Sequence, residues 1–93
     1  MNTYVILRRL GGATPEELQA AAGRSKAEGD KVPNDLRWIR SYVTAETDGS
    51  IGTVCIYQAS SEEAIRDHAV RADIPVDEIF RVLDTVIVRP DPS

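Results

Sequence analysis

The sequence is short of several residue types, and each shortage excludes a class of protein. It has one cysteine, so no internal disulfide can form and nothing requires an oxidising compartment. No apolar run approaches the roughly 18 to 20 residues that a membrane-spanning helix needs. The first apolar stretch precedes its two arginines, which reverses the charge order of a secretory signal. We therefore expect a cytoplasmic protein with no membrane partner.

Positive charge is also scarce. Lysine and arginine total 11 against 15 acidic residues, which gives a net charge of −4. The arginines are scattered and form no stripe that could neutralise a run of phosphates, so we expect no nucleic-acid partner. The Gly11-Gly12 pair is a turn signal, but it stands alone without the pattern of a phosphate-binding loop.

What remains is the composition of one small globular domain. The chain has 93 residues, of which 42% are hydrophobic and 28% charged. A domain of this size buries only roughly two-thirds of its unfolded surface, so association with a second copy would add stability. We predict a single domain over residues 3–89 and a disordered tail, "PDPS", over residues 90–93.

Four segments have the composition of β-strands. Three are rich in β-branched and aromatic residues, namely 3–10, 36–44 and 51–59. Asp48-Gly49 predicts a hairpin turn between the second and third strands, which should therefore pair antiparallel. The alternating stretch "FRVLDTVIV", residues 80–88, predicts a fourth strand.

Two helices are indicated by their N-terminal signals. Thr14 followed by Glu17 forms a capping box, and apolar residues then recur at helical spacing. Ser60 followed by Glu63 forms a second capping box, and that helix should end at Asp73. The resulting order β-α-β-β-α-β is typical of the α+β ferredoxin-like sandwich, a four-stranded antiparallel sheet with two helices on one face.

The second sheet face must contact water, a ligand or another subunit. Strand alternation groups the aliphatic residues on the helix-packed face and leaves a mixed set on the open face: Trp38, Arg40, Tyr42, Thr53, Cys55 and Tyr57. Aromatic residues beside an arginine are typical of interfaces, so we predict homodimerisation, either sheet to sheet or through a sheet edge, around a small ligand. The candidates for the ligand pocket are Trp38, Arg40, Tyr42 and Tyr57. The alternative is an inverted assignment, in which these aromatics belong to the core.

Cys55 and His68 are the only cysteine and histidine. Thiolate and imidazole suit nickel, zinc or copper, but two ligands fall short of the four or more that such an ion needs. The rest would come from carboxylates, water or a second subunit. The alternative is a histidine bonded to a carboxylate or carbonyl and a cysteine that packs as a small hydrophobe. The face assignment puts the two on opposite sides of the sheet, which disfavours a Cys-His nucleophile pair.

Three segments also carry a family resemblance. They are a Trp-x-x-Ser-Tyr-Val strand from Trp38, a Cys-Ile-Tyr strand from Cys55, and a Glu-Glu-Ala-Ile-Arg-x-His-Ala helix from Glu62. In these the chain resembles the small DUF4242 proteins of actinobacteria, a nickel-binding-protein-like group. The resemblance implies a ferredoxin-like fold, a dimer and a bound transition metal. Members often have a glutamate in the first strand where Leu7 falls here, and many have a glycine where Asp73 falls.

The sequence therefore predicts a homodimer that binds nickel or a similar transition metal, for sequestration or homeostasis rather than turnover. Its candidate metal ligands are Cys55 and His68. The alternative function is a cofactor-independent enzyme of the dimeric α/β-barrel type, a cyclase, isomerase or monooxygenase with its organic substrate on the open sheet face. In that case proton transfer would fall to His68 or a tyrosine.

Overall fold

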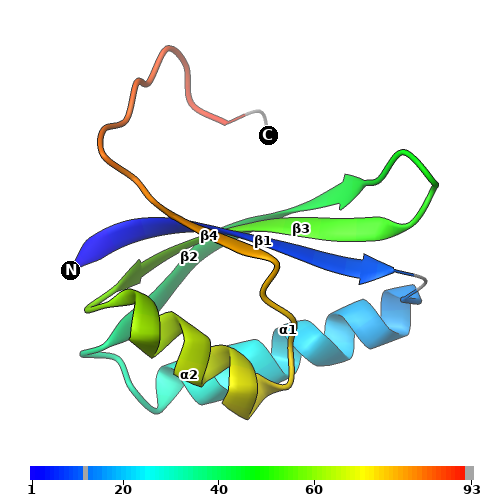
Figure 1. The fold of residues 1–93 in the computed structure, drawn as a ribbon, viewed down its shortest axis with the longest axis horizontal. Helices are drawn as coiled ribbons and strands as arrows, with labels where there is room; N and C mark the ends of the chain where they lie inside the picture. The colour runs from blue at the N-terminus through cyan, green and yellow to red at the C-terminus, as the bar shows by residue number, and fades with distance from the viewer. Residues whose placement is uncertain (12, 92–93) are drawn as a thin grey trace.

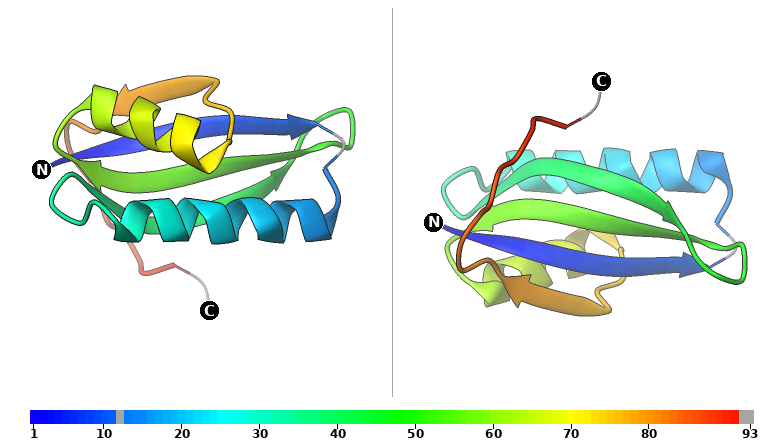
Figure 2. Two further views of the ribbon diagram at one scale, coloured as in Figure 1. Left: turned by 90° about the horizontal axis from the view of Figure 1, so that it is seen from below. Right: turned by 90° about the horizontal axis from the view of Figure 1, so that it is seen from above.

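The chain folds as one antiparallel sheet covered on one side by two helices (Figure 1). The computed structural model describes residues 1–11 and 13–91. Its elements are β1 (Asn2–Gly11), α1 (Pro15–Asp30), β2 (Leu36–Ala45), β3 (Ile51–Ala59), α2 (Glu62–Ala72) and β4 (Glu78–Arg81). The strands lie in the order β2-β3-β1-β4, and both helices cover the same face (Figure 2). The predicted ferredoxin-like class is confirmed.

The helices begin as capping chemistry requires, with one correction. The predicted box at α1 is present: the Thr14 hydroxyl accepts from the Glu17 amide at 3.1 Å, and the Glu17 carboxylate accepts from the Thr14 amide. The box predicted at Ser60 is wrong, because Ser61 caps α2 by accepting from the Ala64 amide. Ser60 instead donates its amide to the Asp35 carbonyl at 2.9 Å and so ties the end of β3 to the start of β2.

Asp73 ends α2 as predicted. Its backbone has φ of 55°, in the left-handed region that commonly closes a helix. Among the residues that the structure describes, no helix is both long and apolar enough to cross a membrane.

The fourth strand is shorter than the predicted 80–88 stretch. Only Glu78–Arg81 pairs with β1, and one further bond joins the Val82 amide to the Thr3 carbonyl at 2.8 Å. Because β1 begins at Asn2, the antiparallel register then runs out of partners. Residues 83–91, here named the C-terminal arm, leave the sheet on the side opposite the helices (Figure 1).

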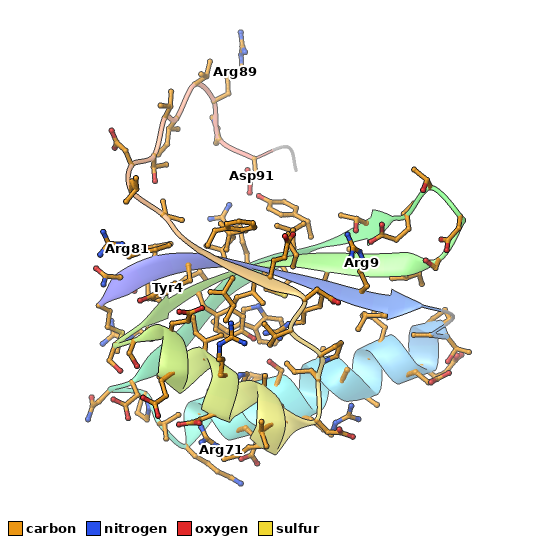
Figure 3. All side chains as sticks on the ribbon, viewed as in Figure 1. Tyr4, Arg9, Arg71, Arg81, Arg89 and Asp91 are labelled. Atoms are coloured by element: carbon orange, nitrogen blue, oxygen red, sulfur yellow. The ribbon has the colours of Figure 1, made fainter. Side chains whose placement is uncertain are left out.

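The end of the arm returns to the sheet at β2. Asp91 accepts hydrogen bonds from the Arg40 guanidinium and the Tyr42 hydroxyl, so the arm crosses the open face from one sheet edge to the other (Figures 2 and 3). Asp91 falls within residues 90–93, the tail predicted as disordered, and makes these two contacts in the structure. Pro92 and Ser93 of that predicted tail lie outside the described residues, as does Gly12 of the predicted turn.

The predicted face assignment is wrong for β3 and for half of β2. The core lies between the sheet and the helices and contains Tyr4, Ile6, Leu36, Cys55, Tyr57, Ala59 and Ile65. Cys55 and Tyr57 are thus buried beneath the helices. In β2 a bulge at Ile39 interrupts the alternation: Trp38 pairs with Tyr57, whereas Arg40 pairs with Ile56. Trp38 therefore lies on the helix side, while Arg40 and Tyr42 lie on the open face.

Candidate functional site

Four polar residues meet between the sheet and the helices, one from each of four elements. Arg8 comes from β1, Ser25 from α1, Tyr57 from β3 and His68 from α2, and all four are buried. We call them the buried polar cluster. Charged and polar side chains are rarely fully buried without partners, so each contact of this cluster needs an account.

Ser25 joins Tyr57 to His68. The Ser25 and Tyr57 hydroxyls share a hydrogen bond of 2.8 Å, and the Ser25 carbonyl lies 2.9 Å from Nε2 of His68. Since a carbonyl only accepts, Nε2 carries the proton, and the buried Nδ1 is a bare acceptor with no hydrogen-bond partner among the described residues.

Burial sets the ionisation of both rings. It raises the pKa of Tyr57, with the Ser25 hydrogen bond acting in the opposite direction. It lowers the pKa of His68, against the effect of the Ser25 carbonyl, and the nearby cations Arg8 and Arg71 lower that pKa further. At neutral pH the cluster therefore holds a neutral imidazole and a neutral phenol.

Arg8 is the unusual member of the cluster. The residue is only 4% exposed, and the guanidinium carbon lies 5.8 Å from the centre of the Tyr57 ring. Nη1 donates to the Pro75 carbonyl at 2.8 Å, but Nη2 has no hydrogen-bond partner in the described part of the chain. Nor does any described carboxylate form an ion pair with it. A buried cation without an anion is costly, so Arg8 lacks the partner its position demands.

A cleft of about 860 Å³ lies beside this cluster, between α1 and the helix-side face of β2 and β3. Arg8, Ser25 and Cys55 line it, so the cluster borders the cleft directly. Trp38 also lines it and stacks on Tyr57, with ring centroids 6.1 Å apart and planes at 5°. The cleft therefore combines aliphatic and aromatic walls with one buried cation.

The four predicted pocket candidates do not share a face. Trp38 and Tyr57 stack together on the helix side, whereas Arg40 and Tyr42 lie on the open face and hold Asp91. Arg40 also reaches the rim of the cleft, as part of its lining. The four residues predicted to form one pocket on the open face therefore lie on opposite faces of the sheet.

Cys55 and His68 lie on the same side of the sheet, so the prediction of opposite sides is wrong. Their contacts match the alternative left open by the sequence: His68 bonds a carbonyl, and Cys55 is buried in the core with its thiol 3.5 Å from the Thr53 hydroxyl. Within residues 1–11 and 13–91, no three His, Cys, Asp or Glu side chains are grouped to hold a metal ion. The structure also supplies no hydrogen bond between the Cys55 thiol and the His68 ring in this described part, so no activated nucleophile is built there.

Arg8 and Ser25 are not predicted from the sequence as functional residues, although the pattern around each residue indicates a buried position. Arg8 follows Tyr4 and Ile6 at alternating positions of β1, so it occupies a buried register. An arginine in a run of inward-facing positions points to a buried charge. Ser25 continues the helical spacing of the apolar residues of α1. It is therefore a small polar residue at a position where a core residue is expected.

Comparison with known proteins places the chain in a family. Residues 4–82 match the family model described as "Nickel responsive protein SCO4226-like". The crystal structure of SCO4226 from Streptomyces coelicolor A3(2) is similar, with a TM-score of 0.72 and 22% identity over 90% of this chain and 99% of that one. A conserved protein from Methanosarcina mazei Go1 is 16% identical, over 88% of this chain and 92% of that one, with a TM-score of 0.39. No curated protein matches the chain. The chain belongs to the SCO4226-like family of nickel-responsive proteins.

Proposed function

We propose that this SCO4226-like protein binds nickel, or a similar transition metal, as a cytoplasmic homodimer that serves metal sequestration or homeostasis rather than turnover. One observation carries the link to nickel: the nickel-responsive family model spans residues 4–82, nearly the whole folded part of the chain. The family's description concerns a response to nickel, and direct binding is our step beyond it.

Cys55 and His68 stay the candidate ligands in this proposal. His68 fits through Nδ1, a buried nitrogen without a hydrogen-bond partner among the described residues, and a neutral imidazole is the form that binds metals. Cys55 would bind as its thiolate. One chain offers no group of three ligands within its described residues, so water or a second chain must complete the coordination.

Leu7 lies where the resemblance expects a glutamate, and its position separates two possible sites. It pairs with Val54 on the open face, while Cys55 and His68 lie on the helix side of the same sheet. A carboxylate at position 7 could not join those two residues, because the sheet lies between them. The presence of Leu7 instead of a glutamate therefore removes no ligand from a site built on Cys55 and His68 of the same chain.

The proposed dimer interface is the open face together with the C-terminal arm. Val5, Leu7, Val54 and Ile56 form the centre of this face and are only partly buried, and Phe80 beside them is 51% exposed. The arm adds four aliphatic residues that are 77–87% exposed: Leu83, Val86, Ile87 and Val88. Exposed apolar side chains of this kind are typical of an interaction site, and a second copy of the chain would supply a matching surface.

The test of nickel binding uses untagged, metal-free protein. We expect isothermal titration with Ni²⁺ to give a dissociation constant in the micromolar range or tighter, and Cys55→Ser with His68→Gln to weaken it strongly. An absence of micromolar binding in the unaltered protein would overturn the nickel proposal itself. Unchanged binding in the double variant would overturn only the assignment of its ligands.

The dimer is tested separately by sedimentation velocity. We expect a dimer at micromolar concentration and a monomer when Phe80 and Ile87 are both replaced by aspartate, because charges on an apolar interface resist burial. Lys26→Asp, at an exposed position of α1 on the helix side of the sheet, is the matched control and should leave the dimer intact. A monomer for the unaltered chain at all concentrations would remove the dimer from the proposal.

The enzyme alternative loses its proposed location. It required Trp38 and Tyr57 on the open face, and both lie on the helix side. A site for an organic molecule in this fold would instead be the cleft beside α1.

A further inference from the structure

We propose that the cleft between α1 and β2 binds a small monocarboxylic acid with an apolar body, and that Arg8 is the partner of its carboxylate. Cys55, a candidate ligand in the nickel proposal, also lines this cleft, but binding of the acid does not depend on nickel. The inference joins two observations: a cleft of ligand size, and a buried cation in its lining without an anion.

The size and lining of the cleft suit a small organic molecule. Its volume of about 860 Å³ falls within the roughly 300–1,000 Å³ that is usual for ligand pockets. Apolar side chains make most of its walls, including Leu10, Leu18, Ala22, Trp38, Val43 and Ile74. These walls favour an aliphatic or aromatic body over a sugar or a nucleotide, which would need many polar partners.

The charge of the bound group follows from Arg8. The Arg8 residue is 96% buried, and its guanidinium makes one hydrogen bond to a carbonyl and leaves the buried Nη2 without a partner among the described residues. A carboxylate would supply both the missing acceptor and the missing negative charge, and its geometry matches the planar guanidinium. The desolvation cost of Arg8 has already been met in folding, so the pair forms without a new burial of this cation.

A monoanion fits better than a phosphate. Among the described residues of the lining, Arg8 carries the only buried charge, and the buried Ser25, Thr53 and Cys55 are neutral. The other charged residues of the lining are exposed, namely Lys26, Asp30, Arg37 and Arg40. A phosphate ester carries close to two charges at neutral pH and would leave one of them uncompensated.

Trp38 reports directly on occupancy of the cleft. It is the only tryptophan in the chain, it is half-buried, and it lines the cleft while stacked on Tyr57. A ligand in the cleft should therefore change the intrinsic fluorescence excited at the indole. No other residue contributes to this signal.

The test is a fluorescence titration with sodium octanoate and 4-phenylbutyrate, repeated by calorimetry. Octanamide is the neutral control of the same shape, and inorganic phosphate is the anion control without an apolar body. We expect saturable binding of the two carboxylates, roughly 10- to 100-fold weaker binding of octanamide, and none of phosphate. Absence of saturable carboxylate binding, equal binding of octanamide, or equal binding of phosphate would each overturn the proposal.

Variants then locate the site. Arg8→Met removes the charge but keeps an unbranched apolar stem, and should weaken octanoate by roughly 10-fold or more while leaving octanamide unchanged. Arg9→Met is the matched control, because Arg9 is the next residue of β1 and points away from the helices (Figure 3). Octanoate affinity that is equal in the Arg8 and Arg9 variants would contradict the assignment.

A third variant keeps the test decisive if Arg8→Met does not fold. Ala22→Phe places a large ring in the cleft from the α1 side and leaves every charge in place. We expect it to abolish the binding of octanoate and octanamide alike. Retained affinity for octanoate in a folded Ala22→Phe protein would show that the ligand binds elsewhere.

Discussion

The two helices cover the same sheet face in different ways. The shorter α2 buries Ile65, His68, Ala69 and Ala72 against the sheet. Among the described residues Pro15–Asp30 of the longer α1, only Ser25 is buried. This helix leaves the cleft between itself and β2. Close packing under α2 supplies stability, while the gap under α1 leaves room for a ligand. The two helices therefore differ in packing: α2 closes its part of the core, whereas α1 leaves the space that our proposal assigns to an organic acid.

The largest expected effect comes from the α2 half. Ile65 is fully buried in the core, so Ile65→Ala should lower the free energy of unfolding by about 2–5 kcal/mol through lost burial and a new cavity. Leu18→Ala in α1 is the matched change at a half-buried position that borders the cleft, and should cost less than about 1 kcal/mol. Urea denaturation followed by circular dichroism measures both. Equal losses would break the comparison.

A smaller loss of stability is expected at the Ser25–Tyr57 hydrogen bond, which joins α1 to β3. Tyr57→Phe removes the hydroxyl that bonds Ser25 and leaves the buried Ser25 hydroxyl without that partner, which should cost about 1–3 kcal/mol. Hydrogen exchange should then speed up more in α1 than in α2, because this bond holds α1 to the sheet. In a double variant with Ser25→Ala the further loss should be small. Uniform acceleration in both helices would contradict this role.

The smallest effect on the free energy of unfolding at neutral pH is expected at His68. Its ring joins α2 to α1 through the hydrogen bond to the Ser25 carbonyl. Burial lowers the pKa of His68, so the folded chain binds fewer protons there than the unfolded chain. Its contribution is fully present above the unfolded value of about 6.5 and is lost as the pH falls through the lower folded value. Arg8 and Arg71 face the ring and oppose protonation, while Glu28 favours it.

The measurement is the free energy of unfolding between pH 8 and pH 5 for the unaltered protein and for His68→Gln. We expect the unaltered protein to lose more stability on acidification than the variant, because glutamine does not titrate. Parallel curves for the two proteins would show that this histidine does not govern the acid limb. A steeper curve for the variant would reverse the sign of the argument.

The element order could be predicted from local chemistry, whereas the faces could not. Three signals each act over a few residues and can be recognised in the sequence: the Thr14 capping box, the Asp48-Gly49 turn and the end of α2 at Asp73, whose backbone is left-handed. The faces of β3 depend on which of two apolar sets the helices cover. The bulge at Ile39 then moves Trp38 and Arg40 to opposite sides, and no local signal marks it.

The candidate site shows the same division. Tyr57 was read as an interface residue because aromatics with polar tips favour interfaces, but Ser25 supplies a buried partner for its hydroxyl and so allows it in the core. That partner lies in α1, far away in sequence. The end of β4 likewise depends on where β1 begins, since pairing stops when the register passes Thr3. Such facts follow only from the assembled fold.

The C-terminal arm is held at both ends, and this has a consequence for association. Val82 is bonded to β1 at one end, and Asp91 is held by Arg40 and Tyr42 at the other. A segment restrained in this way loses less conformational entropy when a second surface docks on it than a free tail would. The clasp at Asp91 is exposed, so added salt weakens its ionic part and loosens the arm. The proposed dimer should therefore grow weaker as ionic strength rises, although the surfaces proposed to meet are aliphatic.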